Sequence, residues 1–397
     1  MTSKFLSFPN FFIRVLVMQI IGYVLVIIAL GRFLAELFER IGYPGIVGEI
    51  TAGLLLGYFL RNVPVSEMDL LAEFGIFFLM ILAGLEITAE ELRMGGKKAL
   101  PVYLVTLAVM FFITLPFTGY SVSTGNVLAA AILAVASAPI VVRIKRFFGE
   151  DYLHVALSYA IISEVAILVL VYILANFKEA HDPADLAITV VKQVLFIGGV
   201  LYLNYKIGIQ HKVWLVTQLR RLRSDEAVFG AFMIFAATLG FISEEVGMHF
   251  TIGAFLAGLI LHSDLVGTRQ YERLETILSG VTYGIFAPIF FAWRGMNFRA
   301  EVTLATVYFF LAIYFVRFLL TVVLTWDGRL VSSIAKATGL VSFGILGLLV
   351  SDLGNSYGVL TGELYSISAL TSIGGIFLAA TIGRGLSLLR RSGGKGL

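Results

Sequence analysis

The chain has 397 residues, of which 59% are apolar and only 14% are charged. A typical soluble domain carries about a quarter charged residues, so this composition excludes an ordinary soluble protein and predicts one that lies mostly in lipid. Cysteine is absent, which excludes disulfides and thiolate metal sites. The formal net charge is +3. No basic cluster is interleaved with aromatic residues, and no nucleic-acid partner or cofactor is predicted.

Long apolar segments divide the chain into about thirteen candidate membrane-spanning helices. A helix needs about 20 predominantly apolar residues to cross the hydrocarbon core of a bilayer. The predicted spans cover residues 12–35, 42–60, 68–87, 99–120, 124–144, 153–176, 185–205, 225–243, 247–263, 277–296, 302–326, 333–353 and 363–388. The expected fold is an all-α polytopic membrane protein, a single membrane domain over residues 1–397 without a soluble regulatory domain.

The basic residues predict the orientation of these spans. With thirteen spans, most of the 29 Lys and Arg residues fall on the side that holds the C-terminus. Cytoplasmic loops carry an excess of Lys and Arg. We therefore expect a multi-pass protein of the cell membrane with the N-terminus outside and the C-terminus in the cytoplasm.

An internal repeat links the second span to the ninth. Gly48-Glu-Ile-Thr-Ala-Gly53-Leu-Leu-Leu resembles Gly253-Ala-Phe-Leu-Ala-Gly258-Leu-Ile-Leu. Seven spans separate the two copies, an odd number, so the copies would have opposite orientations. Inverted repeats are a common architecture of secondary transporters, with the site at the repeat interface. The predicted repeats cover about 42–176 and 247–388, joined by linker helices over about 185–243.

Three charged residues are expected near the centre of the bilayer within predicted spans: Glu164, Lys192 and Arg317. A charge in the bilayer interior is costly, so each is a candidate functional residue. Glu164 lies about 16 Å and Arg317 about 14 Å from the cytoplasmic ends of their spans, so the two side chains are expected to meet at one level. Lys192 lies about 20 Å from that side and is a secondary candidate for a role in transport. The alternative is that its side chain snorkels towards the membrane surface or pairs with a carbonyl.

The chemistry of Glu164 and Arg317 favours ion exchange. Burial raises the pKa of a carboxyl group and a nearby guanidinium lowers it, so such a carboxylate can bind either a proton or a small cation. Arg317 does not deprotonate and would be a fixed counter-charge for the empty site. The alternative is a static buried ion pair that fixes helix packing.

Several polar and helix-breaking residues surround this pair in the sequence. Ser163 precedes Glu164, and Ser137 precedes Pro139 in the fifth span, where proline frees a carbonyl. The oxygen atoms of Ser163, Ser137 and the freed carbonyl are candidate cation ligands, unless the proline only kinks its helix. Gly344 occupies the corresponding place in span 333–353. Glu73 is a further secondary candidate.

Three motifs resemble those of the monovalent cation:proton antiporter family, second branch. They are Ile41-Gly-Tyr-Pro44-Gly-Ile-Val-Gly48-Glu49-Ile-Thr-Ala-Gly53-Leu-Leu-Leu-Gly57, Leu71-Ala-Glu73-Phe-Gly75-Ile-Phe-Phe-Leu-Met-Ile-Leu-Ala-Gly84-Leu-Glu86, and Ala287-Pro288-Ile-Phe-Phe with Gly295-Met-Asn. The resemblance implies a homodimer of thirteen-span protomers. Each protomer would have a dimerising panel domain and a core domain with two crossed, broken helices, here spans 5 and 12, that moves as an elevator. The family's ion-binding carboxylate falls on Glu164 and its basic partner on Arg317.

The chain departs from the family pattern at the site itself. Ser163-Glu164 stands where many members have Asp-Asp and a related branch has Asn-Asp, and Arg317 stands where others have Lys. A single carboxylate implies, by resemblance, one-for-one electroneutral exchange. We therefore expect a Na⁺/H⁺ antiporter in which Glu164 binds Na⁺, Li⁺ or K⁺ in alternation with H⁺. The alternatives are a K⁺/H⁺ antiporter, a sodium-coupled carrier of organic anions and a non-transporting sensor.

Overall fold

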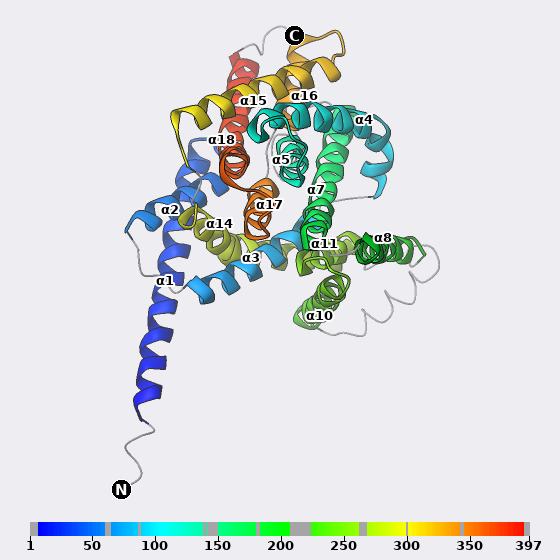
Figure 1. Ribbon diagram of the computed structural model, residues 1–397. Coiled ribbons are helices and arrows are strands. Elements are labelled where there is room, and N and C mark those ends of the chain that lie inside the picture. The colour runs from blue at the N-terminus through cyan, green and yellow to red at the C-terminus, as the bar shows by residue number, and fades with distance from the viewer. Residues whose placement is uncertain are drawn as a thin grey trace. The chain divides into compact units, whose positions relative to one another are not determined.

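The computed structural model describes residues 7–59, 65–85, 89–137, 141, 150–179, 183–206, 224–261, 268–298, 301–341 and 345–392. Every regular element in these ranges is a helix (Figure 1). The first are α1 (Ser7–Arg40), α2 (Gly45–Phe59), α3 (Val65–Leu85), α4 (Ala89–Thr114), η1 (Leu115–Thr118), α5 (Thr124–Ala134), α7 (Glu150–Glu179) and α8 (Pro183–Lys206). The others are α10 (Asp225–Glu245), α11 (Phe250–Ile260), α13 (Thr268–Val281), η4 (Thr282–Phe286), α14 (Ala287–Met296), α15 (Leu304–Leu324), α16 (Leu330–Leu340), α17 (Ile345–Ser356) and α18 (Gly362–Ser392).

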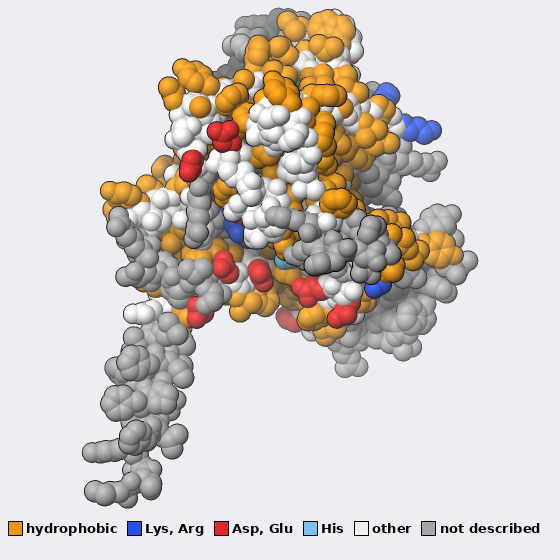
Figure 2. Space-filling model, viewed as in Figure 1, with side chains coloured by type: hydrophobic (Ala, Val, Ile, Leu, Met, Phe, Trp, Pro, Cys, Tyr) orange, Lys and Arg blue, Asp and Glu red, His pale blue; other side chains and the backbone are white. Residues whose placement is uncertain are grey.

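The described helices fit a membrane protein. Within the described ranges, 8 helices are long and apolar enough to cross a bilayer, and shorter apolar helices accompany them. Large apolar side chains are exposed on several of these helices, with Phe33, Phe112 and Ile234 each more than 60% exposed. Hydrophobic side chains cover much of the described surface in Figure 2. The all-α prediction is confirmed, whereas the thirteen spans and the inverted repeats stay predictions.

The chain divides into two compact units. The first unit contains Met1–Leu82 and Glu272–Phe298, and the second contains Ala83–Tyr271 and Arg299–Leu397. Helices α3 and α13 each contribute residues to both units. The second unit holds every residue of the site described below.

The first unit is built around glycine contacts between α1, α2 and α14. A methyl group added at Gly53 of α2 would lie 2.0 Å from the Ala292 carbonyl oxygen of α14. One added at Gly48 would lie 2.4 Å from the Leu34 carbonyl oxygen of α1. Glycine therefore lets the three backbones approach closely, as small residues do in membrane helix packing. The repeat motif in this span thus has a local packing role.

Two helices of the second unit end inside predicted spans 5 and 12, the spans in which the family resemblance implies broken helices. Helix α5 stops at Ala134, inside the predicted span 124–144, and Val135 continues with an extended backbone at ψ 143°. The predicted span 333–353 consists of two helices, α16 and α17, separated between Leu340 and Ile345. Interrupted helices leave carbonyl groups without intrahelical partners, so each such end needs a donor from elsewhere.

Candidate functional site

The guanidinium of Arg317 binds the C-terminal ends of α5 and α16. Arg317 lies on α15 and is completely buried. Its Nη1 donates to the Leu133 carbonyl at 2.7 Å, and its Nη2 donates to the Ala134 and Val135 carbonyls at 3.0 and 2.7 Å. Nη2 also donates to the Leu340 carbonyl at 2.7 Å. One side chain therefore joins the ends of two interrupted helices.

The physical reason for this arrangement is the polarity of a helix end. The last carbonyls of a helix have no intrahelical partner and carry partial negative charge, which a cation stabilises. Two C-terminal ends that meet in an apolar interior would repel each other and remain unsatisfied. A guanidinium offers five donors and a permanent charge, so Arg317 satisfies both ends together. Its positive charge interacts with the partial negative charge at the C-terminal ends of both α5 and α16.

The α5 end also contacts α7, the helix that carries Glu164. The Ala136 N–H donates to Ser163 Oγ at 3.1 Å, and Tyr159 Oη donates to the Ala134 carbonyl at 2.7 Å. Ser163 is fully buried, and Glu164 is only 2% exposed. Glu164 therefore lies on the helix that binds the interrupted segment.

The structure thus brings two predicted residues to one segment of chain. Arg317 binds the Val135 carbonyl, and Ser163 binds the N–H of the next residue, Ala136. Ser137 follows directly and is 2% exposed. A direct contact between Glu164 and Arg317 stays a prediction. Chemically, the site combines a buried carboxyl group, buried hydroxyls and a fixed cation that is bonded to carbonyls.

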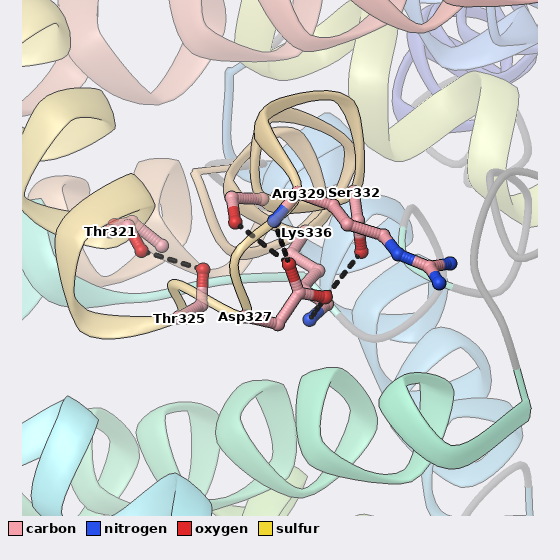
Figure 3. Close-up of polar contacts among 7 residues, drawn as sticks. Thr321, Thr325, Asp327, Arg329, Ser332 and Lys336 are labelled. Atoms are coloured by element: carbon pink, nitrogen blue, oxygen red, sulfur yellow. Dashed lines mark hydrogen bonds and ion pairs between the residues drawn. The ribbon is translucent and has the colours of Figure 1, made fainter.

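The opposite end of α16 is held by Asp327 (Figure 3). The Asp327 carboxylate accepts from the Arg329 backbone N–H at 3.0 Å and from Ser332 Oγ at 2.7 Å, and it pairs with Lys336. The hydrogen bond from Lys336, with that from Ser332, holds the pKa of the Asp327 carboxyl well below its ordinary value. An anion at a helix N-terminus is favourable, so Asp327 and Arg317 stabilise α16 from its two ends.

The remaining predicted residues have varied positions. Lys192 is exposed on α8, and Glu73 is exposed on α3 of the first unit. Pro139 and Gly344 lie outside the described residues. Glu49, which belongs to the first family motif, is 2% exposed and pairs with Arg32 at 3.2 Å within the first unit.

Comparison with known proteins places the chain in a family. The profile described as "Sodium/hydrogen exchanger, transmembrane" matches residues 24–386, most of the chain. The chain belongs to the sodium/hydrogen exchanger family. The prediction of a transmembrane monovalent cation:proton antiporter family is therefore confirmed, and with it the prediction of a multi-pass membrane protein.

Relatives within the sodium/hydrogen exchangers cover most of the chain. A Bacillus cereus protein named probable Na⁺/H⁺ antiporter GerT is 24% identical over 86% of this chain and 92% of its own length. The Na⁺/H⁺-K⁺ antiporter GerN of Bacillus cereus is 26% identical over 86% of this chain and 89% of its own length. The solved structure of the sodium proton antiporter MjNhaP1 from Methanocaldococcus jannaschii at pH 8 superposes with a TM-score of 0.68. It is 15% identical and covers 94% of this chain and 99% of its own, so it shows the exchanger fold alone.

One residue of this exchanger's site was not found from the sequence. Tyr159 is 1% exposed and binds the α5 end through its hydroxyl. It lies one helical turn before Ser163, and residues four apart share a helix face. The position of this tyrosine, four residues before Ser163 on the same helix face, is the sequence feature that could have indicated Tyr159.

Proposed function

We propose that this chain exchanges Na⁺ for H⁺ across the membrane, with Glu164 as the group that binds each ion in turn. The observation that carries the proposal is the burial of Glu164 on the helix that binds the interrupted α5 end. A carboxylate inside a membrane protein is costly and is typical of an ion pathway. Membership in the exchanger family supports the same function.

The exchange would follow from competition for one carboxylate. A deprotonated Glu164 attracts a cation, and burial favours the neutral, protonated form. A bound cation and a bound proton each neutralise the carboxylate, so one displaces the other. Ser163 precedes Glu164, and Ser137 follows Ala136, whose N–H binds Ser163 Oγ. Both serines are buried and would add hydroxyl oxygens to the cation's coordination.

The proposed stoichiometry is one proton for each cation. Ser163 has no titratable carboxyl group, and Arg317 is an arginine bonded to four carbonyls. An arginine in a protein keeps its proton, so it would not carry one across. Only Glu164 would then change protonation, and the exchange would be electroneutral.

We propose an elevator movement for alternating access. The division into two compact units, with the candidate site in only one of them, supports this movement. We also propose that the protein is a homodimer in the cell membrane. Its N-terminus would lie outside and its C-terminus in the cytoplasm. The distribution of Lys and Arg along the sequence supports that orientation.

A second candidate function is K⁺/H⁺ exchange on the same scaffold. The specific observation in its favour is the relative GerN, whose name, Na⁺/H⁺-K⁺ antiporter, includes K⁺. The candidate site consists of a carboxyl group and hydroxyl oxygens, which suit both cations.

The test is proton movement in proteoliposomes that contain a pH-sensitive dye. Addition of Na⁺, Li⁺ and K⁺ in turn, with and without a clamped voltage, measures ion preference and electrogenicity together. Glu164→Gln should abolish cation-dependent proton movement, whereas Glu226→Gln, at an exposed position on α10, should keep it. Wild-type rates in Glu164→Gln would overturn the assignment of Glu164, and no flux with any cation in wild type would overturn the proposed function.

A further inference from the structure

Helix α18 carries a series of buried hydroxyl groups beside the candidate site. Ser366, Ser368, Thr371 and Ser372 are between 0% and 4% exposed. We call these four residues the hydroxyl series. Residues three and four apart share one face of a helix, so Ser368, Thr371 and Ser372 lie together. A buried polar face on a membrane helix is costly unless its hydroxyls have partners.

The hydroxyl series reaches the interrupted segment through α17. A methyl group added at Gly347 of α17 would lie 2.6 Å from Ser372 Oγ and 3.4 Å from Val135 Cγ1. Val135 is the residue whose carbonyl binds Arg317. Gly347 of α17 therefore lies between Ser372 of the hydroxyl series and Val135 at the α5 end.

The other end of the hydroxyl series lies near the start of α15. Ser366 Oγ accepts from the Glu301 N–H at 3.1 Å, just before the Thr303 cap of α15. Along α18, Ser368 is about 6 Å from Ser372 at 1.5 Å per residue. The hydroxyl series thus leads from the beginning of one membrane helix to the interrupted helix that contacts Glu164's helix.

Two members of the hydroxyl series, Ser368 and Thr371, lack the hydrogen bonds that Ser366 and Ser372 make. Ser372 donates to the Ser368 carbonyl and Ser351 donates to the Gly347 carbonyl, each one turn back along its own helix. Among the described residues, the hydroxyl oxygens of Ser368 and Thr371 have no hydrogen-bond partner, although both side chains are completely buried. Such unsatisfied groups in a native interior require an explanation.

We propose that Ser368 and Thr371 are ligands of the transported monovalent cation, at a second oxygen site on α18 within one helical turn of Ser372. A hydroxyl oxygen has two lone pairs to offer, and carbonyl and hydroxyl dipoles replace the hydration shell of an ion in a membrane site. This inference rests on the proposed function and adds a site to it. Within the described part of the chain these two hydroxyls have no hydrogen-bond partner, and in this proposal the cation is their partner.

The substitutions that test this site are Ser368→Ala and Thr371→Val. Thr371→Val keeps the shape of the side chain, and replacing an unsatisfied buried hydroxyl with an apolar group is neutral or stabilising. We therefore expect an unchanged or higher melting temperature without cations, together with about fivefold to tenfold weaker Na⁺ binding, which is about 1–1.4 kcal/mol. Thr371→Ser should restore affinity. A purely structural hydroxyl would instead give a lower melting temperature and unchanged affinity.

The measurement is radioactive Na⁺ binding to the purified full chain, with competition by Li⁺ and K⁺. Ser351→Ala is the matched control, because its hydroxyl is equally buried but already bonded, and it should keep wild-type affinity. Wild-type Na⁺ affinity in both Ser368→Ala and Thr371→Val would overturn this inference alone. Wild-type protein that binds Na⁺ but exchanges no protons would overturn the proposed function alone, and wild-type protein that binds none of the three cations would overturn both.

Discussion

Substitution of Arg317 tests whether its guanidinium holds the two interrupted helices together. We consider Arg317→Met, which keeps an unbranched apolar side chain, and Arg317→Lys, which keeps the charge. In the structure the guanidinium donates to four carbonyls from α5 and α16. Methionine satisfies none of these carbonyls, and an ammonium group has only three donors on a single atom.

The size of the effect can be worked out from these bonds. A hydrogen bond to a charged group contributes about 1.5–3 kcal/mol, so the gross loss in Arg317→Met is about 6–12 kcal/mol. Removing a buried charge also removes its desolvation penalty, and the net cost of breaking a buried charged network is about 3–5 kcal/mol. Arg317→Lys keeps the charge and up to three bonds, so we expect a loss of about 1.5–3 kcal/mol, the value of one bond.

The assay is thermal unfolding of the purified protein in detergent, followed by the loss of its monodisperse chromatographic peak. We expect a fall in melting temperature of about 5 °C or more for Arg317→Met and an intermediate fall for Arg317→Lys. Lys192→Met removes one positive charge from an exposed position on α8 and should leave the melting temperature unchanged. Wild-type melting of Arg317→Met would refute the role assigned to the guanidinium.

Three further predictions concern other contacts. Ser163→Ala leaves a buried backbone N–H of the interrupted segment without its acceptor and should cost about 1–3 kcal/mol, measured by the same melt; an equal melting temperature would contradict it. Asp327→Asn should lower the melting temperature at neutral pH. Since hydrogen bonds lower the folded-state pKa of Asp327, its contribution is present above the unfolded pKa near 4 and is lost as pH falls through the lower folded value. The difference between wild type and Asp327→Asn should therefore be constant from pH 6 to 8 and shrink below about pH 4; a difference that disappears at neutral pH would refute this. Gly53→Ala places a methyl group 2.0 Å from a carbonyl oxygen of α14 and should cost about 1–3 kcal/mol, whereas Gly22→Ala, with open space around it, should be tolerated.

The burial of the site residues could be predicted from the sequence because the surrounding segments are apolar. Glu164 and Arg317 stand in long runs without other charges, and both are buried in the structure.

The hydrogen-bond partners of Arg317 could not be predicted from the sequence. Its guanidinium binds the Leu133 carbonyl, 184 residues away, and the Leu340 carbonyl, 23 residues away. Backbone carbonyls have no residue-specific pattern, so only tertiary structure shows which ones a side chain meets. The exposure of Lys192 could not be predicted from the sequence either. The residues on both sides of it along the helix are mostly apolar, so the sequence predicts a buried position.

The most direct test of the central claim is proton release when Na⁺ binds. Purified wild-type protein in weakly buffered detergent solution should release a proton as Na⁺ is added, because the cation displaces the proton from the Glu164 carboxyl group. Glu164→Gln has no proton to release and should give no acidification at any Na⁺ concentration. Equal proton release from wild type and Glu164→Gln would contradict the account, since another group would then be the one for which the two ions compete.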